Sequence, residues 1–89
     1  MKSQTTEHFR KLLKNLPGRI QRQARVAYKL FRENPQHPSL YFKRVHSVDP
    51  IYSVRISVDY RAIGVYEGDV IIWFWIGSHA DYDGIVSRL

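Results

Sequence analysis

The sequence predicts an α+β fold in which an N-terminal helical hairpin packs on a four-stranded antiparallel sheet, with a short C-terminal helix after it. Apolar residues recur at helical spacing as far as Phe31, and from Leu40 the apolar period changes to two. The connections between the predicted strands are short, as antiparallel strands allow. A chain of 89 residues is expected to form one domain, residues 1–89, around a single core.

Two amphipathic helices are predicted in the first half of the chain. The first has a leucine-rich face at the i, i+3, i+4, i+7 spacing of one helical side, and Pro17 separates it from the second helix. The second has an apolar stripe on one side and a basic stripe on the other, and it must end by Asn34, ahead of Pro35. The apolar positions are Phe9, Leu12, Leu13 and Leu16, then Ile20, Ala24, Ala27 and Phe31.

Four strands are predicted in the second half, followed by a helix over Ala80–Leu89. In the second strand one face carries Tyr52, Val54, Ile56 and Val58, and the other face carries Ser53, Arg55 and Ser57. Glu67–Asp69 is a turn signal between the third and fourth strands. Residues 1–6 are either an edge strand or an unordered start. The predicted strands are Leu40–His46, Ile51–Val58, Tyr60–Tyr66 and Val70–Ile76.

The stretch Val70–Asp83 is expected to organise the fold, because its strand is apolar on both faces and then leads into a polar segment. Strict alternation places Ile71, Trp73 and Trp75 on one face, so we expect a central strand covered on both sides. The single terminal helix is too small to cover a whole face. We therefore expect a groove near the two tryptophans, a setting that suits nucleic acid.

Composition favours a polyanionic partner. Lysine and arginine number 14 against 8 acidic residues, for a net charge of +6. The chain has no cysteine, which fits a reducing compartment. It has neither an apolar run of membrane-spanning length nor an apolar N-terminal signal region. We therefore expect a cytoplasmic protein without membrane contact.

Several basic and titratable side chains are predicted to converge at one end of the sheet. Histidine titrates near neutral pH and can exchange protons, and arginine can stabilise a phosphorane with its permanent charge. These are parts of a metal-free RNA-cleaving site, although for Arg55 and Arg61 a structural ion pair is an equally good interpretation. No cofactor or metal is expected. The candidates are Arg55, Arg61, His79 and Tyr82 for catalysis and Lys43, Arg44, Arg22 and Arg25 for RNA binding.

The chain resembles the RelE/ParE superfamily of bacterial toxin–antitoxin toxins, in its RelE-like branch. The segments NPQHPSLYFKRV, YSVRISVDYRAIG and WIGSHADYD carry the resemblance. It implies a helical hairpin on a small antiparallel sheet, with an N-terminal edge strand for which residues 3–6 are the candidate. It also implies that Arg61 clamps the phosphate with support from Arg55 and that His79 or Tyr82 is the acid.

The resemblance implies a toxin of a type II toxin–antitoxin system that cleaves mRNA on the ribosome and so inhibits translation. The implied partners are a cognate antitoxin, in a possible hetero-oligomer, and the ribosome with its mRNA. Two other functions stay open: inhibition of DNA gyrase, as in the ParE branch, and a degenerate, non-catalytic member of the family.

Overall fold

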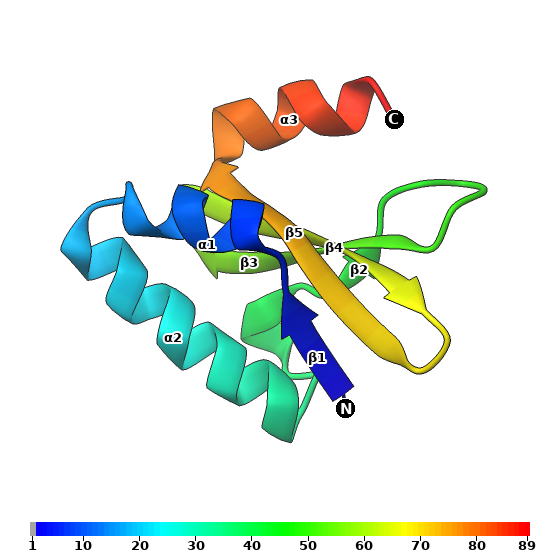
Figure 1. The fold of residues 1–89 in the computed structure, drawn as a ribbon, viewed down its shortest axis with the longest axis horizontal. Helices are drawn as coiled ribbons and strands as arrows, with labels where there is room; N and C mark the ends of the chain where they lie inside the picture. Colours follow the sequence, from blue (N-terminus) through cyan, green and yellow to red (C-terminus); the bar gives the residue numbers. More distant parts are fainter. Residues whose placement is uncertain (1) are drawn as a thin grey trace.

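A computed structural model describes residues 2–89, and it places two helices on one face of a five-stranded sheet and a third helix on the other (Figure 1). The predicted α+β class is confirmed. In chain order the elements are β1 (Lys2–Thr5), α1 (Glu7–Lys14), α2 (Gly18–Glu33), the 3₁₀ helix η1 (Pro38–Leu40), β2 (Lys43–Arg44), β3 (Ile51–Ser57), β4 (Tyr60–Glu67), β5 (Val70–Ser78) and α3 (His79–Ser87).

The sheet has the order β1-β5-β4-β3-β2 and is mixed, so the prediction of four antiparallel strands is wrong in one respect, whereas the N-terminal edge strand that the resemblance implied is present. β1 adds a fifth strand and pairs in parallel with β5. The indole N–H of Trp73 donates to Ser3 Oγ at 3.0 Å, and Lys2 forms an exposed ion pair with Asp69. Pairing with a strongly apolar neighbour thus orders a short polar segment whose own sequence does not specify a strand.

The predicted strand Leu40–His46 is also wrong, because only Lys43–Arg44 is a strand. Leu40 instead ends a 3₁₀ turn that Pro38 begins, and its side chain is buried. Tyr41 follows in the left-handed region, with φ 45° and ψ 43°. A left-handed residue reverses the local path of the chain, so an extended strand cannot run through it.

The two predicted N-terminal helices are present, and Pro17 separates them as predicted, although α1 ends at Lys14, before Leu16, and Pro17 is the N-cap of α2, not its first residue. Thr6 caps α1, its hydroxyl accepting from the Phe9 N–H at 3.0 Å. Pro17 precedes α2, and Asn34 ends it just before Pro35. The two helices do not simply pair with each other, because α1 packs chiefly on β5 whereas α2 packs on β3.

The main core lies between these two helices and the sheet, and aromatic rings fill its centre. The Phe31 ring makes edge-to-face contacts with Phe42 and Trp73, with centroids 5.0 and 5.2 Å apart. Phe42 in turn stacks on Tyr52 at 4.9 Å. Trp73 is 2% exposed, so it is a core residue and not part of the open groove that the sequence suggested.

A bulge in β5 explains why the predicted faces of this strand are wrong. Gly64 pairs with Trp73 and Ile63 pairs with Trp75, so Phe74 is an extra residue in β5. The alternation shifts by one at this point, and Ile76 joins Trp73 in the core under α1 and α2. Trp75 therefore faces the opposite side from Trp73. β5 is also second from the edge of the sheet, and β4 is central.

We predict that Gly64→Ala destabilises the fold by about 1–3 kcal/mol, because an added methyl group overpacks this part of the core. A Cβ at residue 64 would lie 2.7 Å from the Trp73 ring and 3.1 Å from Ile71 Cγ1. The measurement is the free energy of unfolding in urea. Gly84→Ala is the control, since its Cβ meets nothing closer than 3.7 Å and should stabilise α3 by about 0.5–1 kcal/mol. A Gly64→Ala variant as stable as the parent would contradict this packing.

Candidate functional site

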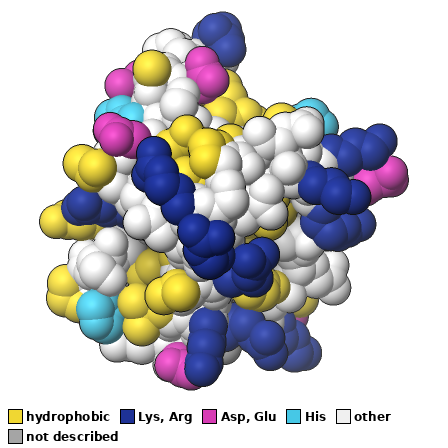
Figure 2. Space-filling view, turned by 90° about the vertical axis from the view of Figure 1, so that its left-hand side faces the viewer, with side chains coloured by type: hydrophobic (Ala, Val, Ile, Leu, Met, Phe, Trp, Pro, Cys, Tyr) yellow, Lys and Arg dark blue, Asp and Glu magenta, His cyan; other side chains and the backbone are white. Residues whose placement is uncertain are grey.

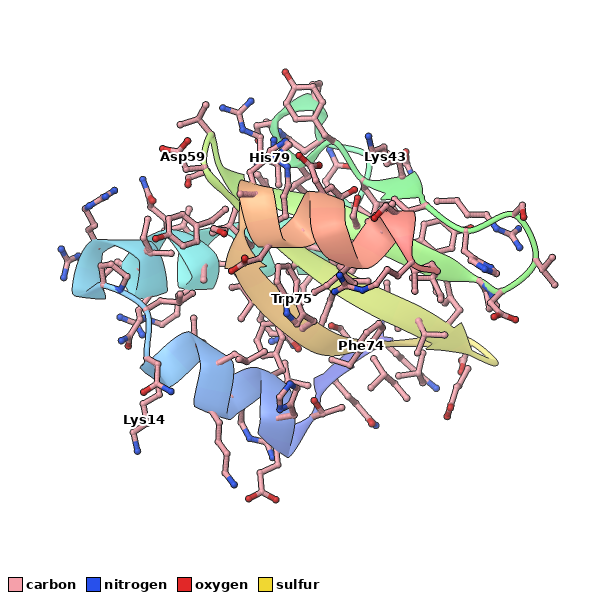
Figure 3. All side chains as sticks on the ribbon, turned by 90° about the horizontal axis from the view of Figure 1, so that it is seen from above. Lys14, Lys43, Asp59, Phe74, Trp75 and His79 are labelled. Carbon is pink, nitrogen blue, oxygen red and sulfur yellow. The ribbon has the colours of Figure 1, made fainter. Side chains whose placement is uncertain are left out.

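The strand register brings three candidate residues, Lys43, Arg55 and Arg61, onto one face of the sheet, the face that carries α3. Residues that pair across antiparallel strands project to the same side. One row across the sheet consists of Arg55, Arg61 and Gly77, and the adjacent row consists of Lys43, Ser53, Ile63 and Trp75. His79 follows directly at the start of α3. Figure 3 shows His79, Asp59 and Lys43 along one side of the molecule, seen from above.

Arg61 is held by the backbone of the β3–β4 turn. One guanidinium nitrogen donates to the carbonyls of Ser57 at 2.6 Å and Tyr60 at 3.0 Å, with a longer contact to Val58 at 3.3 Å. Burial lowers the pKa of Arg61 below its ordinary value, and the positive charge of Arg55 lowers it further; Tyr82, Asp83 and Asp59 act in the opposite direction. Arg61 is thus a positioned cation between Arg55 and nearby acidic groups.

Arg55 has a different environment, because an aromatic ring supports it. Its guanidinium carbon lies 5.2 Å from the centroid of the Tyr41 ring, a cation–π contact. Arg55 also pairs directly with Arg61 across the strands. Sequence reasoning missed Tyr41, since its predicted place in a regular strand gave no sign that it would contact Arg55.

His79 is a partly exposed imidazole oriented by a carboxylate. Its Nδ1 lies 3.2 Å from Asp83 Oδ2, one helical turn later, and its side chain is 43% exposed. The hydroxyl of Ser78 caps α3, and the His79 backbone N–H donates to the Asp59 carbonyl at 2.6 Å. The segment is therefore both the first turn of a helix and the place where a titratable group follows the row of Arg55, Arg61 and Gly77.

Tyr82 is buried against the sheet, unlike His79. It is 6% exposed, and its hydroxyl donates to Ser53 Oγ at 2.9 Å. Ser53 is itself buried and lies on β3, so this hydrogen bond fastens α3 to the sheet. The His79 and Tyr82 rings still contact each other, with centroids 5.7 Å apart. The sequence contained no signal for the partnership between Tyr82 and Ser53.

The other basic candidates do not form one surface. Lys43 is exposed beside Ser53, on the face of the arginine pair. Arg44 points elsewhere and holds the following loop, donating to the carbonyls of His46 at 3.0 Å and Val48 at 2.9 Å.

The two candidates on α2 line different grooves. Arg25 lines a mainly apolar groove of about 770 Å³ between α1, α2 and the sheet. Arg22 lines a groove of about 830 Å³ on the other side of α2, together with Arg19, Tyr41 and Arg55. Figure 2 shows lysine and arginine side chains in a band across the face where α1 connects to α2.

Within residues 2–89, no three histidine or acidic side chains come together in a way that could hold a metal ion. In the same part of the chain, no helix is both long enough and apolar enough to cross a membrane.

The family is established by a match to a family model. The model of the ParE-like toxin domain matches residues 18–84, which span α2, the sheet from β2 to β5 and the first turns of α3. The chain belongs to this family. The predicted membership of the RelE/ParE superfamily is thereby confirmed, and the matched region contains every candidate site residue.

Solved structures of other toxins have the same fold. The RelB–RelE antitoxin–toxin complex from Methanococcus jannaschii matches with a TM-score of 0.72 and 20% identity, covering 91% of this chain and 95% of the other. YafQ from Escherichia coli BL21(DE3) matches with a TM-score of 0.72 and 14% identity, covering 91% and 96%. The RelE–RelB complex from Pyrococcus horikoshii matches with a TM-score of 0.68 and 17% identity, covering 86% and 92%. No curated protein sequence matches the chain.

We predict that Tyr82→Phe destabilises this ParE-like domain by about 1–3 kcal/mol, because it leaves the buried Ser53 hydroxyl without its partner. Adding Ser53→Ala should recover most of the loss, since both polar groups are then absent. Urea unfolding of the two single variants and the double variant measures the coupling. Additive losses would show that the hydrogen bond does not fasten α3 to the sheet.

Proposed function

We propose that this ParE-like domain is the toxin of a toxin–antitoxin system and that it inhibits translation by cleaving mRNA on the ribosome. The observation that carries the proposal is the imidazole of His79, which Asp83 orients at 3.2 Å. It lies on the segment that follows Gly77, and Gly77 pairs with Arg61, which in turn pairs with Arg55. An oriented proton carrier next to positioned cations is what phosphodiester cleavage requires.

The reaction joins the 2′-oxygen of a ribose to the adjacent phosphorus and breaks the bond from that phosphorus to the 5′-oxygen. One group removes the 2′-hydroxyl proton, and another supplies a proton to the leaving 5′-oxygen. With Nδ1 turned toward Asp83, His79 presents Nε2 for one of these transfers. Because the Tyr82 hydroxyl is buried and already donates to Ser53, we assign this role to His79 and not to Tyr82.

The two arginines divide the electrostatic work. Arg61 is held by three carbonyls of the turn, so it stays at one position and stabilises the developing negative charge of the phosphorane. Arg55 rests on Tyr41 and contacts the phosphate directly. Exposed Lys43 lies on the same face and attracts the RNA backbone.

We further propose a protein antitoxin as the partner, seated in the groove between α1 and α2. The floor of this groove is apolar and includes Phe9, Leu13 and Trp73, while Arg10, Arg25, Lys29 and Arg32 supply cations. An amphipathic segment with acidic residues along its edges matches both features. Two of the structures with this fold are complexes of a toxin with its antitoxin.

Gyrase inhibition is a second candidate function, because the matching family model is that of the ParE-like toxin domain. An inhibitor that acts by contact needs no proton carrier. The oriented His79 therefore favours RNA cleavage over this alternative and over a non-catalytic family member.

We predict that His79→Asn lowers the rate of ribosome-dependent mRNA cleavage by about 10²–10⁴-fold, the usual contribution of a general acid or base. Asp83→Asn should have a smaller effect, because it keeps the imidazole and removes only the carboxylate charge that orients it and acts on Arg61. The measurement maps new mRNA 5′ ends after induced expression, with urea unfolding as the control for folding. To test Arg61 in the same assay, we prefer Arg61→Lys to Arg61→Ala, because the lysine keeps a positive charge beside the β3–β4 turn.

The outcomes separate the alternatives. New ends within translated frames that disappear with His79→Asn support the proposal. Growth arrest without new ends, accompanied by blocked supercoiling, would replace it with gyrase inhibition. No growth arrest from a folded protein that is free of antitoxin would indicate a degenerate member.

We predict that Arg25→Glu weakens binding of the co-expressed antitoxin by about tenfold or more, because it opposes an acidic partner at the edge of the apolar groove. Arg22→Glu is the matched control. It makes the same charge reversal at an exposed residue of the same helix, but Arg22 lines the other groove. Titration calorimetry of the two purified variants measures the difference. Equal affinities would place the antitoxin elsewhere.

A further inference from the structure

Tyr41 combines a strained backbone with an exposed aromatic ring. Its φ of 45° lies in the left-handed region, which a Cβ disfavours, and it is the only such residue other than glycine within residues 2–89. The position ends the 3₁₀ helix η1, with the Tyr41 N–H donating to the Pro38 carbonyl at 3.3 Å. Glycine or asparagine would serve this purpose with less strain.

Packing in the core does not explain why residue 41 is a tyrosine. The residue is 60% exposed, so it adds little to the core. Its ring makes a cation–π contact with the guanidinium of Arg55, which lies 5.2 Å from the ring centroid. Arg55 lies over the ring, and most of the residue is exposed to solvent. Backbone strain that packing does not offset is often found at functional sites.

The surroundings of the ring indicate what it contacts. Tyr41 and Arg55 line the groove of about 830 Å³ along α2, and Arg19 and Arg22 line the same groove. The two α2 arginines are exposed and three positions apart, so they lie on one side of the helix. Proteins that bind single-stranded nucleic acid combine an exposed aromatic ring with a positively charged groove, and this groove has both features and extends from the proposed cleavage site.

We propose that Tyr41 stacks on one nucleobase of the RNA strand and that Arg19 and Arg22 bind the phosphates beyond it. The inference rests on the proposed function, because it gives the RNA a path from the Arg55–Arg61 pair along α2. The base lies on the open side of the ring, so that Arg55, Tyr41 and the base form a continuous stack. A tyrosine at this position thereby selects for an unpaired base next to the phosphate that is cleaved.

The test measures binding, not cleavage. The full-length protein, freed of antitoxin, is titrated into a fluorescent single-stranded RNA of about eight nucleotides. Every 2′-hydroxyl in this RNA is methylated, so that it cannot be cut. A second RNA of the same length has every base removed. Fluorescence anisotropy at low salt reports both affinities.

Three variants separate the ring from the backbone conformation. Tyr41→Asn keeps the left-handed conformation and removes the ring, so affinity for the intact RNA should fall roughly 5–100-fold, the range for one lost base stack. Its affinity for the abasic RNA should fall much less, because only the support that the Tyr41 ring gives to Arg55 is lost there. Tyr41→Phe should bind both RNAs as the parent does. Arg22→Ala should weaken both equally, since phosphates carry no base information.

Urea unfolding of Tyr41→Asn completes the test. A variant that is as stable as the parent or more stable, yet binds intact RNA poorly, supports the proposal. Unchanged affinity of Tyr41→Asn for intact RNA would overturn it, as would a parent protein that binds the intact and abasic RNAs equally. Ribosomal cleavage that survives Tyr41→Asn without any binding defect would leave the proposed function standing and remove this inference. If the parent binds RNA through Tyr41 but does not cleave mRNA, the stacking inference stands and the proposed cleavage function is wrong.

Discussion

The bulge at Phe74 is the constraint on which the packing of both sheet faces depends. Without it, Trp73 and Trp75 would lie on the same face of β5. With it, Trp73 enters the core beneath α1 and α2, and Trp75 turns to the face that carries α3. Gly64 makes this possible, because a side chain there would occupy the space of the Trp73 ring. The shift also aligns Gly77 with Arg61, so the chain leaves β5 beside the arginine pair.

The polar groups near that exit divide into those that hold the geometry and those that are accessible. Arg61 donates to the turn, and Tyr82 donates to Ser53 beneath α3. The Arg61 bonds fix the β3–β4 turn, and the Tyr82 bond fixes α3 on the sheet. Breaking the buried Tyr82–Ser53 bond is costly, because an unpaired buried polar group loses more free energy than a typical hydrogen bond gains. Arg55 and His79 are partly exposed and stand on the framework that the first group provides.

The sequence predicted what depends on periodicity and on local breakers. The helix faces and the positions of Pro17 and Pro35 determined α1 and α2, and the alternation in β3 placed Arg55 opposite the core. The rest depends on pairing between distant segments. A bulge has no period of its own, β1 is a strand only because β5 lies beside it, and nothing local distinguishes a buried Tyr82 from an exposed one.

The features that folding alone does not explain gather at one corner of the molecule. Arg55 and Arg61 stand opposite each other across two strands, an arrangement of like charges that weakens a sheet. Tyr41 keeps a left-handed backbone without burying its ring. A sequence selected only for stability would place an acidic residue opposite one arginine and a glycine at residue 41. Local penalties are normally scattered or removed, so their concentration around Arg55 supports our proposal that this surface binds an anionic, base-bearing ligand.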